Sequence, residues 1–140
     1  MKKILIILFI STFLISVAYA QESWNNIEYD IPDQFHIVED TSDKLYMEDN
    51  KANSITLKSY DKHEYVDMTG SYNKISDNSY QLNKKQINET RHTKGDEFLY
   101  AYIFQQMNKT YVIYYKTTDK TIYVTNTFNP AHTLINSIKT

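Results

Sequence analysis

The stretch His63-Glu64-Tyr65-Val66-Asp67 has the residue types and spacing closest to a metal-dependent hydrolase. On a helix, His63 and Asp67 would share one face with Glu64 beside them, similar to the zinc motif H-E-x-x-H, in which two ligands flank a general base. Asp67 replaces the second histidine, and a third ligand would have to come from His36, His92 or His132. One His-Glu pair is common by chance, and Gly70 weakens a helix here. A solvated polar turn is therefore the preferred interpretation, and we predict no metal site.

Two acidic runs could present oxygen atoms to calcium: Glu39-Asp40 with Asp43, and Glu48-Asp49-Asn50. Neither has the spacing or the glycine of an EF-hand, and ordinary charged turns explain both. No set of Ser, His and Asp can be assembled from spacing alone. We predict no catalytic residue and no cofactor. An extracytoplasmic hydrolase with a His/carboxylate site is kept as the alternative.

The composition excludes several other kinds of functional site. Cysteine is absent and only two glycines occur, Gly70 and Gly95. Thiol nucleophiles, disulfides and thiolate metal sites all need cysteine, and phosphate-binding loops need closely spaced glycines. The formal net charge is −2 and Arg91 is the single arginine. We therefore expect no nucleic-acid partner, because binding phosphates needs a clustered basic surface.

Residues 1–20 have the pattern of an export signal. Lys2 and Lys3 precede an apolar stretch from Ile4 to Ile15, and Ala18-Tyr19-Ala20 supplies the small residues of a cleavage site. The apolar stretch is short for a bilayer span, which takes about 20 residues. We predict cleavage after Ala20, a single globular domain over residues 21–140, no stable membrane span after cleavage, and a secreted or cell-envelope location. An uncleaved N-terminal anchor is the alternative.

Alternating apolar residues predict that this domain consists mainly of strands. The two-residue period is clear over Ile27–Ile31 and Ser54–Lys58, with shorter candidates at Phe35–Val38 and Lys44–Met47. Tyr65, Met68 and Tyr72 allow a short helix, and Gln81–Glu89 allows a helix or an edge strand. At the end of the chain, Asn129 is a good N-cap with Pro130 at the first helical position. The helical stripe is Ala131, Leu134, Ile135 and Ile138.

Three consecutive strands are predicted over Glu97–Gln106, Thr110–Thr117 and Thr121–Phe128. Turns at Asn108-Lys109 and Thr118-Asp119-Lys120 would pair Tyr102 with Tyr115, and Tyr115 with Tyr123. One sheet face is then aromatic and the other aliphatic. The aromatic face consists of Phe98, Tyr100, Tyr102, Phe104, Tyr111, Ile113, Tyr115 and Tyr123, and the aliphatic face of Leu99, Ala101, Ile103, Val112, Tyr114, Ile122 and Val124.

We expect the C-terminal helix on the aliphatic face. For the aromatic face, the middle of the chain with Tyr60, Tyr65, Met68 and Tyr72 could cover it. Alternatively, it could be an exposed platform for a sugar ring or a protein partner, because tyrosine offers contact area at low entropic cost. In the second case the ligand-binding residues are Tyr100, Tyr102, Tyr115 and Tyr123. The N-x-[ST] sequences at Asn88 and Asn108 are candidate glycosylation acceptors, with Asn108 in a turn.

The order of elements resembles small exported members of the PsbP and Mog1 superfamily. The similar features are the opening Ile27-Glu28-Tyr29-Asp30-Ile31-Pro32-Asp33-Gln34-Phe35, the tyrosine-rich meander and the closing Leu134-Ile135-Asn136-Ser137-Ile138 helix. Gln34 stands where that family usually has glycine. The resemblance implies an α/β/α sandwich and an accessory or binding role without a shared catalytic set. A cystatin-like or NTF2-like sheet is the competing fold and would need a longer helix.

The sequence therefore predicts an α+β domain with an antiparallel meander and a C-terminal helix packed on one face. We interpret it as an exported, monomeric, non-catalytic binding or accessory protein of the cell envelope. Its partner would be an envelope protein or a glycan. The identity of that partner is not encoded in any motif.

Overall fold

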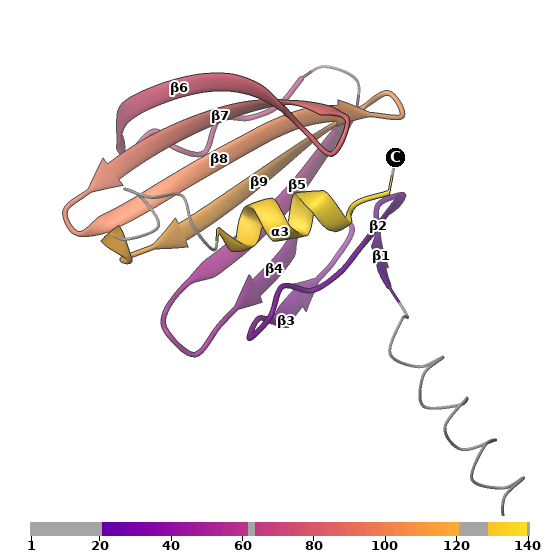
Figure 1. Ribbon diagram of the computed structural model, residues 1–140, viewed down its shortest axis with the longest axis horizontal. Helices are drawn as coiled ribbons and strands as arrows, with labels where there is room; N and C mark the ends of the chain where they lie inside the picture. The colour runs from indigo at the N-terminus through magenta and orange to yellow at the C-terminus, as the bar shows by residue number, and fades with distance from the viewer. Residues whose placement is uncertain (1–20, 62–63, 121–128, 140) are drawn as a thin grey trace, which may run out of the picture.

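The computed structural model describes residues 21–61, 64–120 and 129–139 and has one helix packed on an antiparallel sheet (Figure 1). This confirms the α+β class. The predicted signal, residues 1–20, and the predicted strand over Thr121–Phe128 with Tyr123 lie outside the described residues. The elements are β1 (Glu22–Trp24), β2 (Ile27–Tyr29), β3 (His36–Asp40), β4 (Leu45–Glu48), β5 (Ser54–Asp61), β6 (Asn73–Leu82), β7 (Lys85–Lys94), β8 (Glu97–Gln106), β9 (Lys109–Thr117) and α3 (Pro130–Ser137).

Seven strands form one sheet in the order β3-β4-β5-β9-β8-β7-β6, and β1 and β2 form a separate hairpin. The alternating segments predicted around Ile27, Ser54, Glu97 and Thr110 are all strands. The most apolar strands, β8 and β9, lie in the middle of the sheet with both faces buried. β6 lies at the edge and is largely exposed.

The turn between β8 and β9 corrects the predicted register. Met107 and Asn108, not Asn108 and Lys109, occupy the turn, and both have positive φ, as a tight hairpin turn that follows the twist of the strands requires. Tyr102 therefore pairs with Ile113, and Tyr100 pairs with Tyr115. The predicted pairing of Tyr102 with Tyr115 is wrong by two residues. A shift of two preserves the side-chain alternation, so the division into an aromatic and an aliphatic face holds.

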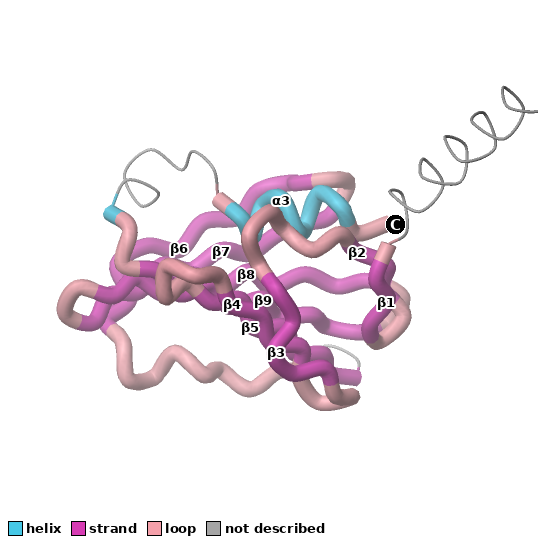
Figure 2. Tube along the Cα trace, turned by 90° about the horizontal axis from the view of Figure 1, so that it is seen from below, coloured by secondary structure: helices cyan, strands magenta, loops and turns pink. Residues whose placement is uncertain are grey.

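The middle of the chain differs most from the prediction. The region around Gln81–Glu89 is a hairpin of β6 and β7, with Asn83 and Lys84 at positive φ in its turn. The helix predicted at Tyr65, Met68 and Tyr72 is wrong, because residues 64–72 are irregular. We call residues 64–72 the covering segment. In Figure 2 it runs along the side of the sheet opposite α3.

Helix α3 begins as predicted. The Asn129 side chain accepts a hydrogen bond from the Ala131 amide, and Pro130 stands in the first turn. Its carbonyl end is held by the β6–β7 hairpin. The buried Lys85 Nζ and the Asn83 side-chain amide both donate to the Ile138 carbonyl, at 2.9 Å and 2.8 Å. A cation beside the last carbonyls favours the helix dipole.

The helix lies on the aromatic face, which corrects the prediction that it covers the aliphatic face. Its stripe packs in one core with the β8 and β9 aromatics and with Trp24, Ile27 and Tyr29 of the β1–β2 hairpin. The covering segment lies on the aliphatic face, where Tyr60 and Tyr72 pack against Leu99, Ala101, Val112 and Tyr114. The helix and the covering segment lie on the opposite faces from those considered in the sequence analysis. Burial of apolar area does not require aliphatic side chains to pack on aliphatic ones or aromatic side chains on aromatic ones. Tyrosine hydroxyls on both faces hydrogen-bond to their covers: Tyr102 Oη to Asn129, and Tyr114 Oη to Val66 and Met68.

Candidate functional site

The proposed tyrosine row is buried under α3. Tyr100 and Tyr102 are 0% exposed and Tyr115 is 1% exposed, while Tyr123 lies outside the described residues. The rings of Tyr100 and Tyr102 stack at 6.3 Å, and Tyr100 contacts Tyr115 at 5.7 Å. The exposed platform expected for these described tyrosines is therefore wrong in its geometry. Aromatic side chains bury the most apolar area per residue, and this face is where the core needs them.

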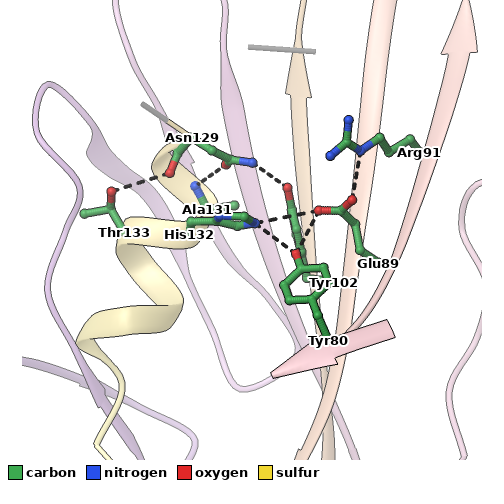
Figure 3. Close-up of polar contacts among 8 residues, drawn as sticks. All are labelled: Tyr80, Glu89, Arg91, Tyr102, Asn129, Ala131, His132 and Thr133. Carbon is green, nitrogen blue, oxygen red and sulfur yellow. Dashed lines mark hydrogen bonds and ion pairs between the residues drawn. The ribbon is translucent and has the colours of Figure 1, made fainter. Parts of the chain in front are cut away.

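A buried polar cluster lies where α3 meets β7 and β8 (Figure 3). The Glu89 carboxylate accepts hydrogen bonds from Tyr80 Oη at 2.8 Å and from Arg91 Nε at 2.8 Å. His132 Nε2 lies 2.9 Å from Tyr80 Oη and 3.7 Å from the same carboxylate. Beside them, Asn129 Nδ2 donates to Tyr102 Oη at 2.6 Å. The sequence gives no local signal for this cluster, because β6 and β7 form one hairpin while α3 lies about 40 residues further along the chain.

The electrostatics of the cluster make Glu89 a fixed anion. Burial by itself raises the pKa of Glu89, but hydrogen bonds from His132, Arg91 and Tyr80 outweigh burial and lower the pKa to about 2. Burial and the neighbouring carboxylate raise the pKa of the Tyr80 hydroxyl above its ordinary value. A carboxylate that remains ionised and fully hydrogen-bonded is a weak proton acceptor at neutral pH. The cluster therefore anchors the helix more readily than it moves protons.

A few hydrogen bonds hold the covering segment on the opposite face of the sheet. Tyr114 Oη donates to the Val66 carbonyl and accepts from the Met68 amide, both at 3.3 Å. Tyr72 Oη donates to Glu97 at 2.6 Å. Within the segment, the Thr69 amide and hydroxyl both donate to Asp67 Oδ1, and these bonds lower the pKa of Asp67. Three side chains of this segment nevertheless face solvent: Tyr65 is 43% exposed, Val66 63% and Met68 55%.

Between the covering segment and the sheet lies a pocket of about 120 Å³, which we call the His92 pocket. Its apolar floor comes from Ala101, Ile103, Val112 and Tyr114 of the two central strands. Its polar wall comes from β6, β7 and the covering segment. The polar lining consists of Tyr65, Asp67, Thr69, Lys74, Asp77, Asn88, Thr90 and His92.

His92 is the most unusual residue of this pocket. It is 5% exposed, and its Nε2 lies 2.8 Å from the Thr90 hydroxyl. Its Nδ1 is buried and has no hydrogen-bond partner. Burial lowers the pKa of His92, so the ring is neutral at pH 7. Leaving a buried ring nitrogen unpaired costs roughly 1–3 kcal/mol.

The sequence held a signal for this pocket. Asn88, Thr90 and His92 alternate along β7 and therefore lie on one face of the sheet. That alternation is hard to recognise because the residues are polar and the segment is also open to a helical interpretation. Asn88, one of the two N-x-[ST] asparagines, lines the pocket, while Asn108 is exposed in the β8–β9 turn.

The other residues considered for catalysis or metal binding do not lie together. His63 lies outside the described residues, and Glu64 and Asp67 are on the irregular covering segment. Glu39 pairs with Lys44 at 2.8 Å, and Asp49 accepts from Lys51 and Asn53 to close the β4–β5 turn. Over the described part of the chain, no group of three or more His, Asp or Glu side chains could hold a metal ion. Within the same residues, no helix has the length and apolar character needed to cross a bilayer.

No family model matches the chain, and no curated protein matches it. The two faces of the sheet differ in a way that bears on function. One is sealed by a helix and its polar cluster, and the other retains a pocket.

Proposed function

We propose that the chain is an exported, non-catalytic binding protein of the cell envelope whose binding face is the covering segment together with the His92 pocket. The observation that carries this proposal is the pocket itself, with a buried unpaired imidazole nitrogen beneath exposed Tyr65, Val66 and Met68. Concave sites with an apolar floor and a few polar groups are the usual form of ligand sites. The export signal and the resemblance to PsbP and Mog1 proteins support the envelope location and the accessory role. The α/β/α sandwich implied by that resemblance stays part of the proposal.

The experiment is cosedimentation of the mature protein, beginning at Gln21, with envelope fragments from its own host. A triple variant carrying Tyr65→Ser, Val66→Ser and Met68→Ser removes the exposed apolar side chains of the covering segment. The matched control carries Val38→Ser and Met107→Ser, which are 53% and 74% exposed and lie outside the proposed face. We expect at least a tenfold loss of binding in the triple variant and none in the control. Equal binding by all three proteins would refute the proposed face.

A second candidate, an extracytoplasmic hydrolase, is favoured by one observation. Tyr80 Oη lies within hydrogen-bond distance of both Glu89 and His132, which is a His/carboxylate arrangement at the end of a helix. The low pKa and 1% exposure of Glu89 argue against it. Chromogenic ester, peptide and glycoside substrates test it directly. A hydrolase would show turnover that is lost in His132→Ala, whereas the binding protein would show none in either form.

A further inference from the structure

The charges lining the His92 pocket are already engaged by neighbouring side chains. Lys74 Nζ contacts Asp77 Oδ2 at 2.7 Å, and Asp67 Oδ1 accepts two hydrogen bonds from Thr69. The neutral His92 ring adds no charge. Lys74 and Asp77 therefore pair with each other, while Asp67 keeps its negative charge because Thr69 is neutral. Around that single carboxylate the lining offers many polar partners to an uncharged ligand.

The polar lining mixes donors and acceptors at close range. Lys74 donates, the carboxylates of Asp67 and Asp77 accept, and the Asn88 amide does both. A hydroxyl group is the ligand group that both donates and accepts, so several neighbouring hydroxyls would pair with this mixture. The apolar floor and the exposed ring of Tyr65 add surface for a C–H face.

From these contacts we propose that the His92 pocket binds a neutral sugar residue, with one hydroxyl on the Asp67 carboxylate, another on the Lys74 ammonium, and the sugar ring against Tyr65. The pocket volume of about 120 Å³ suits one partly inserted ring and not an extended chain. This inference rests on the proposed binding function and names its ligand class.

The test is an NMR titration of the mature protein with four probes, the methyl glycosides of glucose, galactose, mannose and N-acetylglucosamine. The imidazole signals of His92 report on occupation of the pocket that it lines. We expect a saturable shift of the His92 signals with at least one glycoside at millimolar concentration. His36, which is exposed on β3, gives the internal control and should not shift.

Two pocket variants and one control variant complete the test. Asp67→Asn removes an exposed carboxylate and should weaken the sugar at least fivefold without unfolding the protein. Asp43→Asn, an exposed acidic residue outside the pocket lining, is its matched control and should bind normally. His92→Leu should abolish binding, and its thermal unfolding shows whether it is folded.

The inference is overturned if no glycoside shifts the His92 signals, or if Asp67→Asn binds the sugar as well as the parent protein. It is also overturned if choline, used as a cationic probe, shifts the His92 signals while the glycosides do not. Failure of the sugar and failure of the binding function are separable. If none of the four glycosides binds but the triple variant of the covering segment still loses envelope binding, the sugar proposal is refuted. The proposed binding face then stands.

Discussion

The two faces of the central sheet, one mainly aromatic and one mainly aliphatic, are closed in different ways. On one face, α3 buries the β8 and β9 aromatics, and its cluster of Glu89, Arg91, Tyr80 and His132 satisfies the buried charge. On the other face, an irregular segment held by Tyr114 and Tyr72 leaves a polar pocket. From this difference we expect stability to be concentrated under the helix, and we propose that binding takes place under the covering segment.

The largest expected effect comes from opening the helix face. Leu134→Ala removes a side chain that is 0% exposed from the centre of the core. We expect a loss of about 2–5 kcal/mol in the free energy of unfolding, measured by urea denaturation. Met68→Ala on the covering segment is the counterpart and should change it by less than about 0.5 kcal/mol, because Met68 is exposed. Equal losses would contradict the division between the faces.

Acid should weaken the helix face through Glu89. The pKa of this group is lowered from its ordinary value of 4.5 to about 2 in the folded protein, so its contribution is present above pH 4.5 and is lost as the pH falls toward 2. The contribution corresponds to roughly 3 kcal/mol. Glu89→Gln should be less stable by a similar amount at pH 7 and should lose less stability in acid. A variant with the same pH profile as the parent would show that Glu89 is not the anion described above.

Loss of the α3 cap should have the next largest effect on stability. Asn129 both accepts from the Ala131 amide and donates to Tyr102 Oη. Asn129→Ala should therefore destabilise the protein by about 1–2 kcal/mol, the upper range for loss of an N-cap. Asn136→Ala, an exposed position on the same helix, should be close to neutral. Thermal unfolding of the two variants side by side measures the difference.

The smallest effect on stability should come from the covering segment. Tyr114→Phe removes the hydroxyl that contacts the Met68 amide and the Val66 carbonyl. We expect a global loss of about 0.5–1 kcal/mol, with faster amide exchange confined to the covering segment. Hydrogen exchange read by mass spectrometry resolves the two effects. Faster exchange across β8 and β9 as well would mean that the segment is part of the main cooperative core.

Sequence patterns predict the elements better than their assembly. Alternation locates β8 and β9, and Asn129 with Pro130 locates the start of α3, because these signals are local. The positive-φ turn at Met107 and Asn108 has no glycine to mark it, so the predicted register is shifted by two. Which cover lies on which face depends on contacts such as Asn129 with Tyr102, between residues distant in the chain. The His92 pocket escapes sequence reasoning for another reason: its polar wall comes from consecutive segments, the covering segment, β6 and β7, whose alternation is polar and is open to a helical interpretation.

Binding on the face of the covering segment, and not on the helix face, is the central claim. Hydrogen-exchange mass spectrometry of the mature protein, alone and with envelope fragments of its host, tests it most directly. We expect slower exchange at residues 64–72 and 88–92 on binding, with α3 unchanged. Protection of α3 and the β1–β2 hairpin, with residues 64–72 unchanged, would contradict it.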